Sequence, residues 1–63
     1  MTQQQEYLTE KLMLTITAMG AQGLLMEEGK TTTPAGIPRT QRLQTLQMKA
    51  LKFLFELEGT LKQ

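Results

Sequence analysis

The sequence GKTTTPAGIPRT, residues 29–40, separates the chain into two parts and indicates its fold class. It holds two glycines, both prolines and four threonines, a composition that interrupts any helix. Gly29 suits the end of a preceding helix, because glycine adopts the left-handed conformation at little cost. Pro34 holds Thr33 extended, and Pro38 fits the first turn of a following helix, where its missing amide would be unpaired. The segment is therefore expected to connect two helices.

Both sides of this connection have the composition of α-helices. Leu, Met, Gln, Glu, Lys and Ala dominate, Val is absent and only two Ile occur, so strands are not expected. Thr2 and Gln5 have the spacing of a capping box, and Gly59 is expected to end the second helix. The predicted elements are a helix over about residues 3–28, a connection over residues 29–39 and a helix over about residues 40–58. Residues 1–63 then form a single all-α domain, an antiparallel two-helix hairpin.

Gly20 and Gly23 lie in the middle of the first predicted helix, where each costs up to about 1 kcal/mol relative to Ala. Two interpretations stay open. The glycines could permit close approach of another helix, or they could break the helix and give three helices instead of two. We favour a continuous or mildly bent helix.

Apolar residues follow each predicted helix in two separate stripes at helical spacing. The main stripes, expected to form the core, are Leu8, Leu12, Ile16, Met19, Gly23 and Met26 in the first helix and Leu43, Leu46, Ala50, Phe53, Leu54, Leu57 and Leu61 in the second. The second stripes, predicted to bind a partner, are Tyr7, Leu14, Ala18, Ala21 and Leu25 in the first helix and Met48, Leu51 and Phe55 in the second. A hairpin covers one stripe of each helix, so we expect oligomerisation or a partner to complete the fold.

The formal charge of +1 is too small for a dedicated polyanion-binding protein. The one arrangement suited to phosphates, an alternative nucleic-acid site, lies on the second helix and consists of Arg39, Arg42, Lys49 and Lys52. No aromatic residue is interleaved there for base stacking. Glu27 and Glu28, at the end of the first helix, are also expected to pair with Arg39 and Arg42 across the hairpin.

Most residue types that carry out chemistry are absent from the sequence, which has no Ser, Cys, His, Asp, Asn, Trp or Val. The chain therefore cannot form a Cys or His zinc site, a Ser-His-Asp or Cys-His constellation, or a disulfide. The tripeptide Gly29-Lys30-Thr31 resembles the end of a phosphate-binding loop, but that motif requires glycine at position 24, which is Leu. We expect no enzyme activity, metal or cofactor.

The most apolar window, residues 12–26, is shorter than the roughly 20 residues of a membrane-spanning helix, so no membrane partner is expected. The absence of cysteine is compatible with the reducing cytoplasm, which is the expected location. In size and inferred fold the chain is similar to small bacterial or phage helical adaptors. We predict a non-enzymatic protein–protein interaction module, an adaptor, inhibitor or chaperone, that binds itself or another protein. The alternatives are a small nucleic-acid-binding regulator and a virion or assembly subunit.

Overall fold

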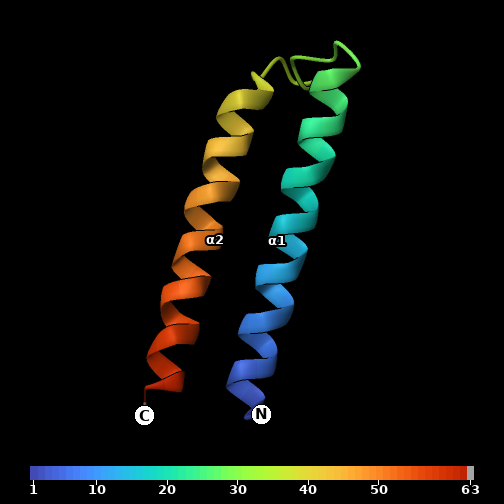
Figure 1. Ribbon diagram of the computed structural model, residues 1–63. Coiled ribbons are helices and arrows are strands. Elements are labelled where there is room, and N and C mark those ends of the chain that lie inside the picture. Colours follow the sequence, from blue (N-terminus) through green and yellow to red (C-terminus); the bar gives the residue numbers. More distant parts are fainter. Residues whose placement is uncertain (63) are drawn as a thin grey trace.

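The computed structural model describes residues 1–62, which fold as an antiparallel hairpin of two long helices. Helix α1 spans Gln3–Glu27, helix α2 spans Arg39–Leu61, and a short connection joins them at one end (Figure 1). The beginning of α1 and the end of α2 lie together at the other end of a rod of 44 × 17 × 15 Å. The prediction of an all-α two-helix hairpin is confirmed.

Both ends of α1 are closed by local hydrogen bonds. The hydroxyl of Thr2 accepts a bond from the Gln5 amide at 3.1 Å, and the Gln5 side chain accepts one from the Thr2 amide at 3.0 Å, so the capping box forms. At the other end Gly29 has a φ of 86°. The Lys30 amide there donates to the Leu25 carbonyl, which completes the glycine-terminated helix end that the sequence predicts.

One detail of the helices agrees with the favoured expectation and one differs from it. Helix α1 continues without interruption through Gly20 and Gly23, so the three-helix alternative is not realised. Helix α2 passes Gly59, its predicted end, and reaches Leu61. Thr60 is half-buried against α1, and packing of this last turn offsets the low helix propensity of the glycine.

The connection between the helices contains a tight turn of its own. The Gly36 amide donates to the Thr33 carbonyl at 2.8 Å, and the Thr33 amide donates to the Ile37 carbonyl at 2.8 Å. Pro34 follows Thr33, and Gly36 has a φ of 83°. This combination matches the three-residue hairpin turn in which a glycine in the left-handed region closes the loop.

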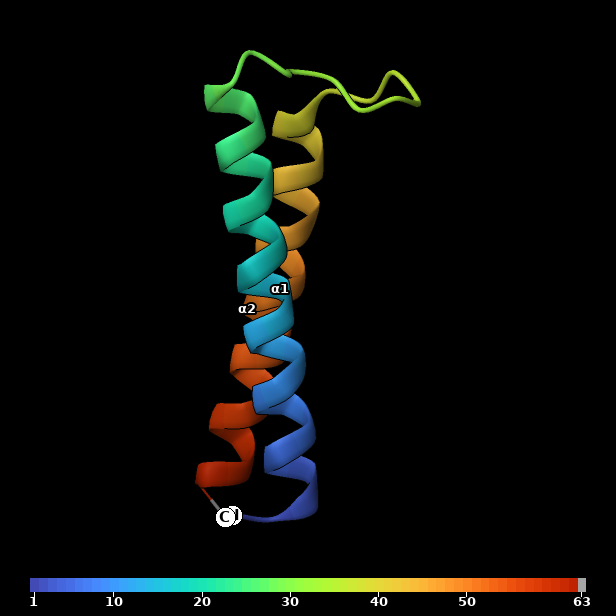
Figure 2. The ribbon, with the colours of Figure 1, turned by 90° about the vertical axis from the view of Figure 1, so that its right-hand side faces the viewer.

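Further bonds fix the base of this turn. The Arg39 amide donates to the Thr31 carbonyl at 2.8 Å, and Thr32 pairs with Pro38 in an isolated antiparallel bridge. The turn projects sideways beyond the helix ends (Figure 2). The connection therefore has a defined hydrogen-bonded conformation.

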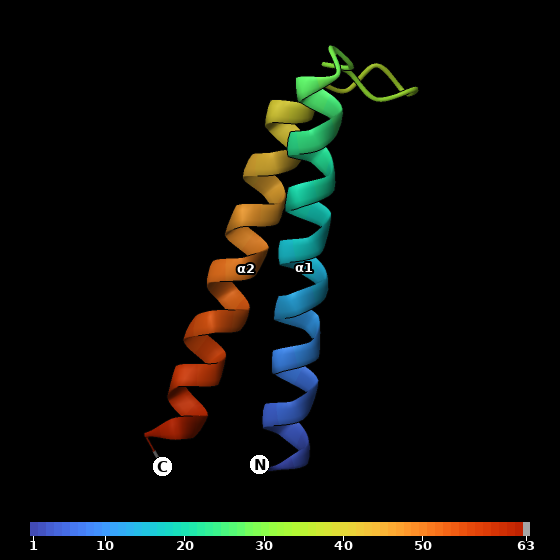
Figure 3. The same cartoon turned by 45° about the vertical axis from the view of Figure 1, so that its right-hand side comes forward.

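The two helices meet along a seam with the alternating three- and four-residue spacing of a coiled coil. The seam residues are Gln5, Leu8, Leu12, Thr15, Met19, Gln22 and Met26 of α1 and Arg39, Leu43, Leu46, Ala50, Phe53, Leu57 and Thr60 of α2. Every one of them is buried or half-buried. The helices lie side by side in Figure 1, and in the turned view of Figure 3 they are closest near the connection and diverge toward the two chain ends.

The predicted core stripes are wrong at three positions. Ile16, Leu54 and Leu61 are exposed. Thr15, and not Ile16, occupies the seam of α1, where its hydroxyl donates to the Lys11 carbonyl at 2.8 Å. The hydroxyl is thereby satisfied within its own helix, so a threonine can be buried at this position.

Arg39 ties the connection to both helices. Its side chain is only 8% exposed, its Nε donates to the Lys30 carbonyl at 2.7 Å and its Nη1 donates to Gln22 Oε1 at 2.9 Å. The expected pairing of Arg39 and Arg42 with Glu27 and Glu28 does not form. Within residues 1–62 the one ion pair joins Lys30 Nζ to Glu28 Oε2 at 3.5 Å, between two exposed side chains. Neutral acceptors therefore hold the guanidinium.

Candidate functional site

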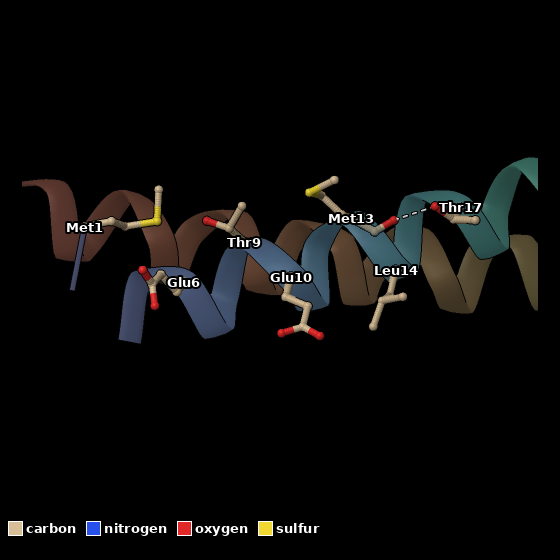
Figure 4. Close-up of a pocket in the computed structure, with 7 residues that line it drawn as sticks. All are labelled: Met1, Glu6, Thr9, Glu10, Met13, Leu14 and Thr17. Carbon is tan, nitrogen blue, oxygen red and sulfur yellow. Dashed lines mark hydrogen bonds between the residues drawn. The ribbon is translucent and has the colours of Figure 1, made fainter. Parts of the chain in front are cut away.

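The side chains of residues 1–62 do not gather into a metal-binding centre. This part of the chain holds no group of three His, Cys, Asp or Glu placed to bind a metal ion. A depression of about 380 Å³ is lined by Met1, Glu6, Thr9, Glu10, Met13, Leu14 and Thr17. The side chains that α1 contributes point to different sides of the helix, and α2 lies behind it (Figure 4). The depression is therefore an open surface of one helix.

The seam separates two flanks of the hairpin, each built from both helices. Successive residues of a helix are rotated by about 100°, which shows which residues border the seam on each side. In an antiparallel pair, the residues that border the seam on one side of α1 lie beside those that border it on the same side of α2. We call one side the apolar flank, which consists of Thr9, Met13, Ile16, Gly20 and Gly23 of α1 and Gln44, Gln47, Leu51 and Leu54 of α2. The opposite side is the basic flank, which consists of Tyr7, Lys11, Leu14, Ala18, Ala21 and Leu25 of α1 and Arg42, Thr45, Lys49, Lys52 and Glu56 of α2.

The apolar flank exposes large apolar side chains, and its charged neighbours Glu27 and Glu58 lie at the two ends of the rod. Ile16 is 54% exposed, Leu51 45% and Leu54 38%. A hollow of about 340 Å³ opens beside them and is lined by Met19, Gln47, Ala50 and Leu51. A Cβ atom at Gly20 or Gly23 would meet no atom within 4 Å, so the glycines do not serve close packing of α1 on α2. Because neither glycine has a side chain, the surface of α1 on this flank does not protrude at these two positions.

The eight residues predicted to bind a partner are not brought together. The five from α1 lie on the basic flank: Tyr7, Leu14, Ala18, Ala21 and Leu25. Met48 and Phe55 are exposed on the outer side of α2, away from α1. Of the eight, Leu51 alone lies on the apolar flank.

Sequence spacing assigned three residues of the apolar flank to the core, which are Gly23 and the two large apolar residues Ile16 and Leu54. Spacing places a stripe on one helix, but it does not show which stripes of two antiparallel helices share a side. A heptad pattern that admits polar residues at the seam would have found them. Thr15 and Phe53 would then occupy the seam, with Ile16 and Leu54 one position beyond it.

The basic flank holds the remaining residues of the nucleic-acid alternative. Its exposed cations are Lys11, Arg42, Lys49 and Lys52. Lys11 Nζ lies 5.5 Å from the centroid of the Tyr7 ring, and Glu56 reduces the positive charge of the same flank. Arg39 is buried in the seam and does not belong to this surface.

The hairpin exposes more surface than a compact protein of its mass. Its accessible surface is 4844 Å², whereas a compact folded monomer of 7.1 kDa exposes about 4,100 Å². Within residues 1–62, Leu8 is the one apolar side chain that is buried. An isolated hairpin therefore has a thin core and a surplus of about 700 Å² of surface.

Comparisons with known proteins do not assign a function. The chain matches no protein-family model, no curated protein and no solved structure. Neither α1 nor α2, the two helices of residues 1–62, combines the length and apolar character needed to cross a membrane. The function has to be inferred from the surface of the hairpin.

Proposed function

We propose that the chain is a non-enzymatic protein–protein interaction module that docks through its apolar flank. The observation that carries this proposal is the exposure of Ile16, Leu51 and Leu54 along a strip without charge. Burial of apolar surface is favourable by about 25 cal/mol per Å², so covering these side chains yields several kcal/mol. That gain is comparable to the whole stability of a small domain.

The composition of the flank suits an adaptor, inhibitor or chaperone. Such a surface binds through buried area and shape, because it offers few polar groups that could orient a small ligand. Met13 on the flank and Met19 in the adjoining hollow are unbranched thioethers that repack without strain. This adaptability supports contact with another helical surface.

Site-specific photo-crosslinking in the cell that produces the protein tests the proposal. A photoreactive phenylalanine analogue replaces Leu51 on the apolar flank, and in the matched control it replaces Thr45, an exposed residue of the basic flank on the same helix. We expect protein adducts from position 51 and few from position 45. An adduct with a second copy of the chain or with a different protein supports the proposal, and absence of adducts at position 51 refutes it.

The second candidate is a nucleic-acid-binding regulator that uses the basic flank. The observation that favours it is the gathering of Lys11, Arg42 and Lys49 from two helices on one side. Phosphate-driven affinity for a duplex falls steeply between about 50 and 200 mM salt, whereas apolar docking changes little. Binding of a mixed-sequence RNA or DNA duplex that shows this salt dependence and is lost in Lys49→Ala would establish the second candidate.

A further inference from the structure

We infer that the occupant of the apolar flank is a second copy of this chain, packed flank against flank to form a four-helix bundle. The inference rests on the proposed function, because it assigns a partner to the same surface. Area, charge and shape each support it.

The surplus surface of the hairpin has the size of a dimer interface. The molecule exposes 4844 Å², about 700 Å² more than a compact protein of its mass. A stable interface of standard size buries about 800 Å² on each partner. If a second copy covers one flank, the exposed surface area of each chain therefore falls to about that of a compact protein.

Charge selects which flank meets the second copy. In a twofold dimer each surface faces itself, so a charged patch faces the same charges. Contact between two basic flanks would oppose their cations, Lys11, Arg42, Lys49 and Lys52. Contact between two apolar flanks brings no cations of this kind together, and the acids Glu27 and Glu58, which continue this flank at its two ends, are exposed at the rim of such a contact.

The shape of the apolar flank can accommodate a protruding side chain from the second copy. Gly20 and Gly23 place no side chain on the α1 side, and the neighbouring hollow of about 340 Å³ is shallow and open to solvent, so a second surface can reach it. Ile16 and Leu51 protrude from the same flank and are about half exposed. Each copy thus presents both a hollow and side chains that can fill the hollow of the other, as a self-complementary interface requires.

A second copy also completes the core. Leu12, Met19 and Leu43 are only half-buried in the single hairpin. Two hairpins packed on their apolar flanks enclose such seam residues from a second direction, as in four-helix bundles. The dimer therefore supplies the reinforcement that disulfides or metals give to other domains of this size.

Sedimentation equilibrium of the purified full chain tests the inference. The concentration range is about 1 to 200 µM, because an interface of this area is expected to have a micromolar or tighter dissociation constant. The expected species has twice the monomer mass of 7.1 kDa. Leu51→Glu should raise the dissociation constant at least about 30-fold, as for a central apolar contact, while the control Thr45→Glu changes it less than about 3-fold. Leu51→Ala is a milder second variant, and far-UV circular dichroism verifies that each variant is helical.

The outcomes separate this inference from the proposed function. A wild-type chain that stays monomeric up to the highest concentration, or that forms any assembly other than a dimer, overturns the inference. The proposed function survives that result if position 51 crosslinks to a different protein in cells. A dimer that tolerates Leu51→Glu and Leu51→Ala, or that Thr45→Glu weakens equally, overturns the assignment to the apolar flank.

Discussion

Replacement of Arg39 by Ala should destabilise the hairpin more than any other change of a charged residue. The guanidinium is almost fully buried and bridges the Lys30 carbonyl, at 2.7 Å, and the Gln22 side chain, at 2.9 Å. It therefore joins the connection, α1 and the first turn of α2. Removing it leaves two acceptors without their donor and opens the end of the seam.

The expected loss follows from these two bonds. A hydrogen bond from a charged donor contributes about 1.5–3 kcal/mol, and removal of the buried charge also returns part of its desolvation cost. With each bond taken at the lower end of that range, Arg39→Ala costs about 3 kcal/mol of unfolding free energy. That loss would remove most of the roughly 3–5 kcal/mol of stability that a domain of this size has.

Urea denaturation followed by far-UV circular dichroism measures this loss, at one fixed protein concentration because self-association would add to stability. Arg42→Ala is the matched control, since Arg42 is exposed three residues later on α2, and it should cost less than about 0.5 kcal/mol. Arg39→Lys should recover less than half of the loss, because an ammonium group lacks the fork that reaches both acceptors. If Arg39→Ala and Arg42→Ala unfold at the same urea concentration, the bridging role is refuted.

Two further predictions concern the glycines and the core. Gly29→Ala should lower the free energy of unfolding by about 1–2 kcal/mol, because Gly29 has a φ of 86°. Gly59→Ala, within the helical α2, should raise the free energy of unfolding by about 0.5–1 kcal/mol. If Gly29→Ala raises the midpoint of thermal denaturation, the observed helix end is contradicted. Leu8→Ala should cost about 2–4 kcal/mol because Leu8 is 3% exposed, whereas Leu24→Ala on the outer side of α1 should cost under about 0.5 kcal/mol. Equal urea midpoints for these two leucine variants would show that the seam is not the core.

The residues of the second apolar stripes lie on different sides of the hairpin, so their variants change different surfaces. Tyr7, Leu14 and Leu25 share a side with the cations of α2, whereas Leu51 shares a side with Ile16. Substitutions in the first group and at Leu51 therefore change different surfaces. A partner that covers the apolar flank leaves the basic flank accessible to solvent.

The local features of the fold could be predicted from the sequence because they depend on residues close together in the chain. The Thr2 capping box and the helix end at Gly29 each form within one or two turns, and the propensities of the remaining residues exclude strands. The prolines and glycines of the connection likewise predict that it interrupts the helices, but they do not predict its hydrogen-bonded turn or its attachment to α1 through Arg39 and Gln22. The hairpin and its approximate boundaries follow from these rules.

The identity of the seam and of the two flanks depends on contacts between residues distant in the chain. Thr15 and Ile16 are neighbours about 100° apart on α1, and packing against α2 turns the threonine inward. From the sequence, Arg39 is predicted to be an exposed cation. In the folded chain the Lys30 carbonyl and the Gln22 side chain accept hydrogen bonds from its guanidinium, which makes its burial favourable. Likewise, Ile16 and Leu51 come to share a flank through the antiparallel register of the two helices, which no single helix specifies.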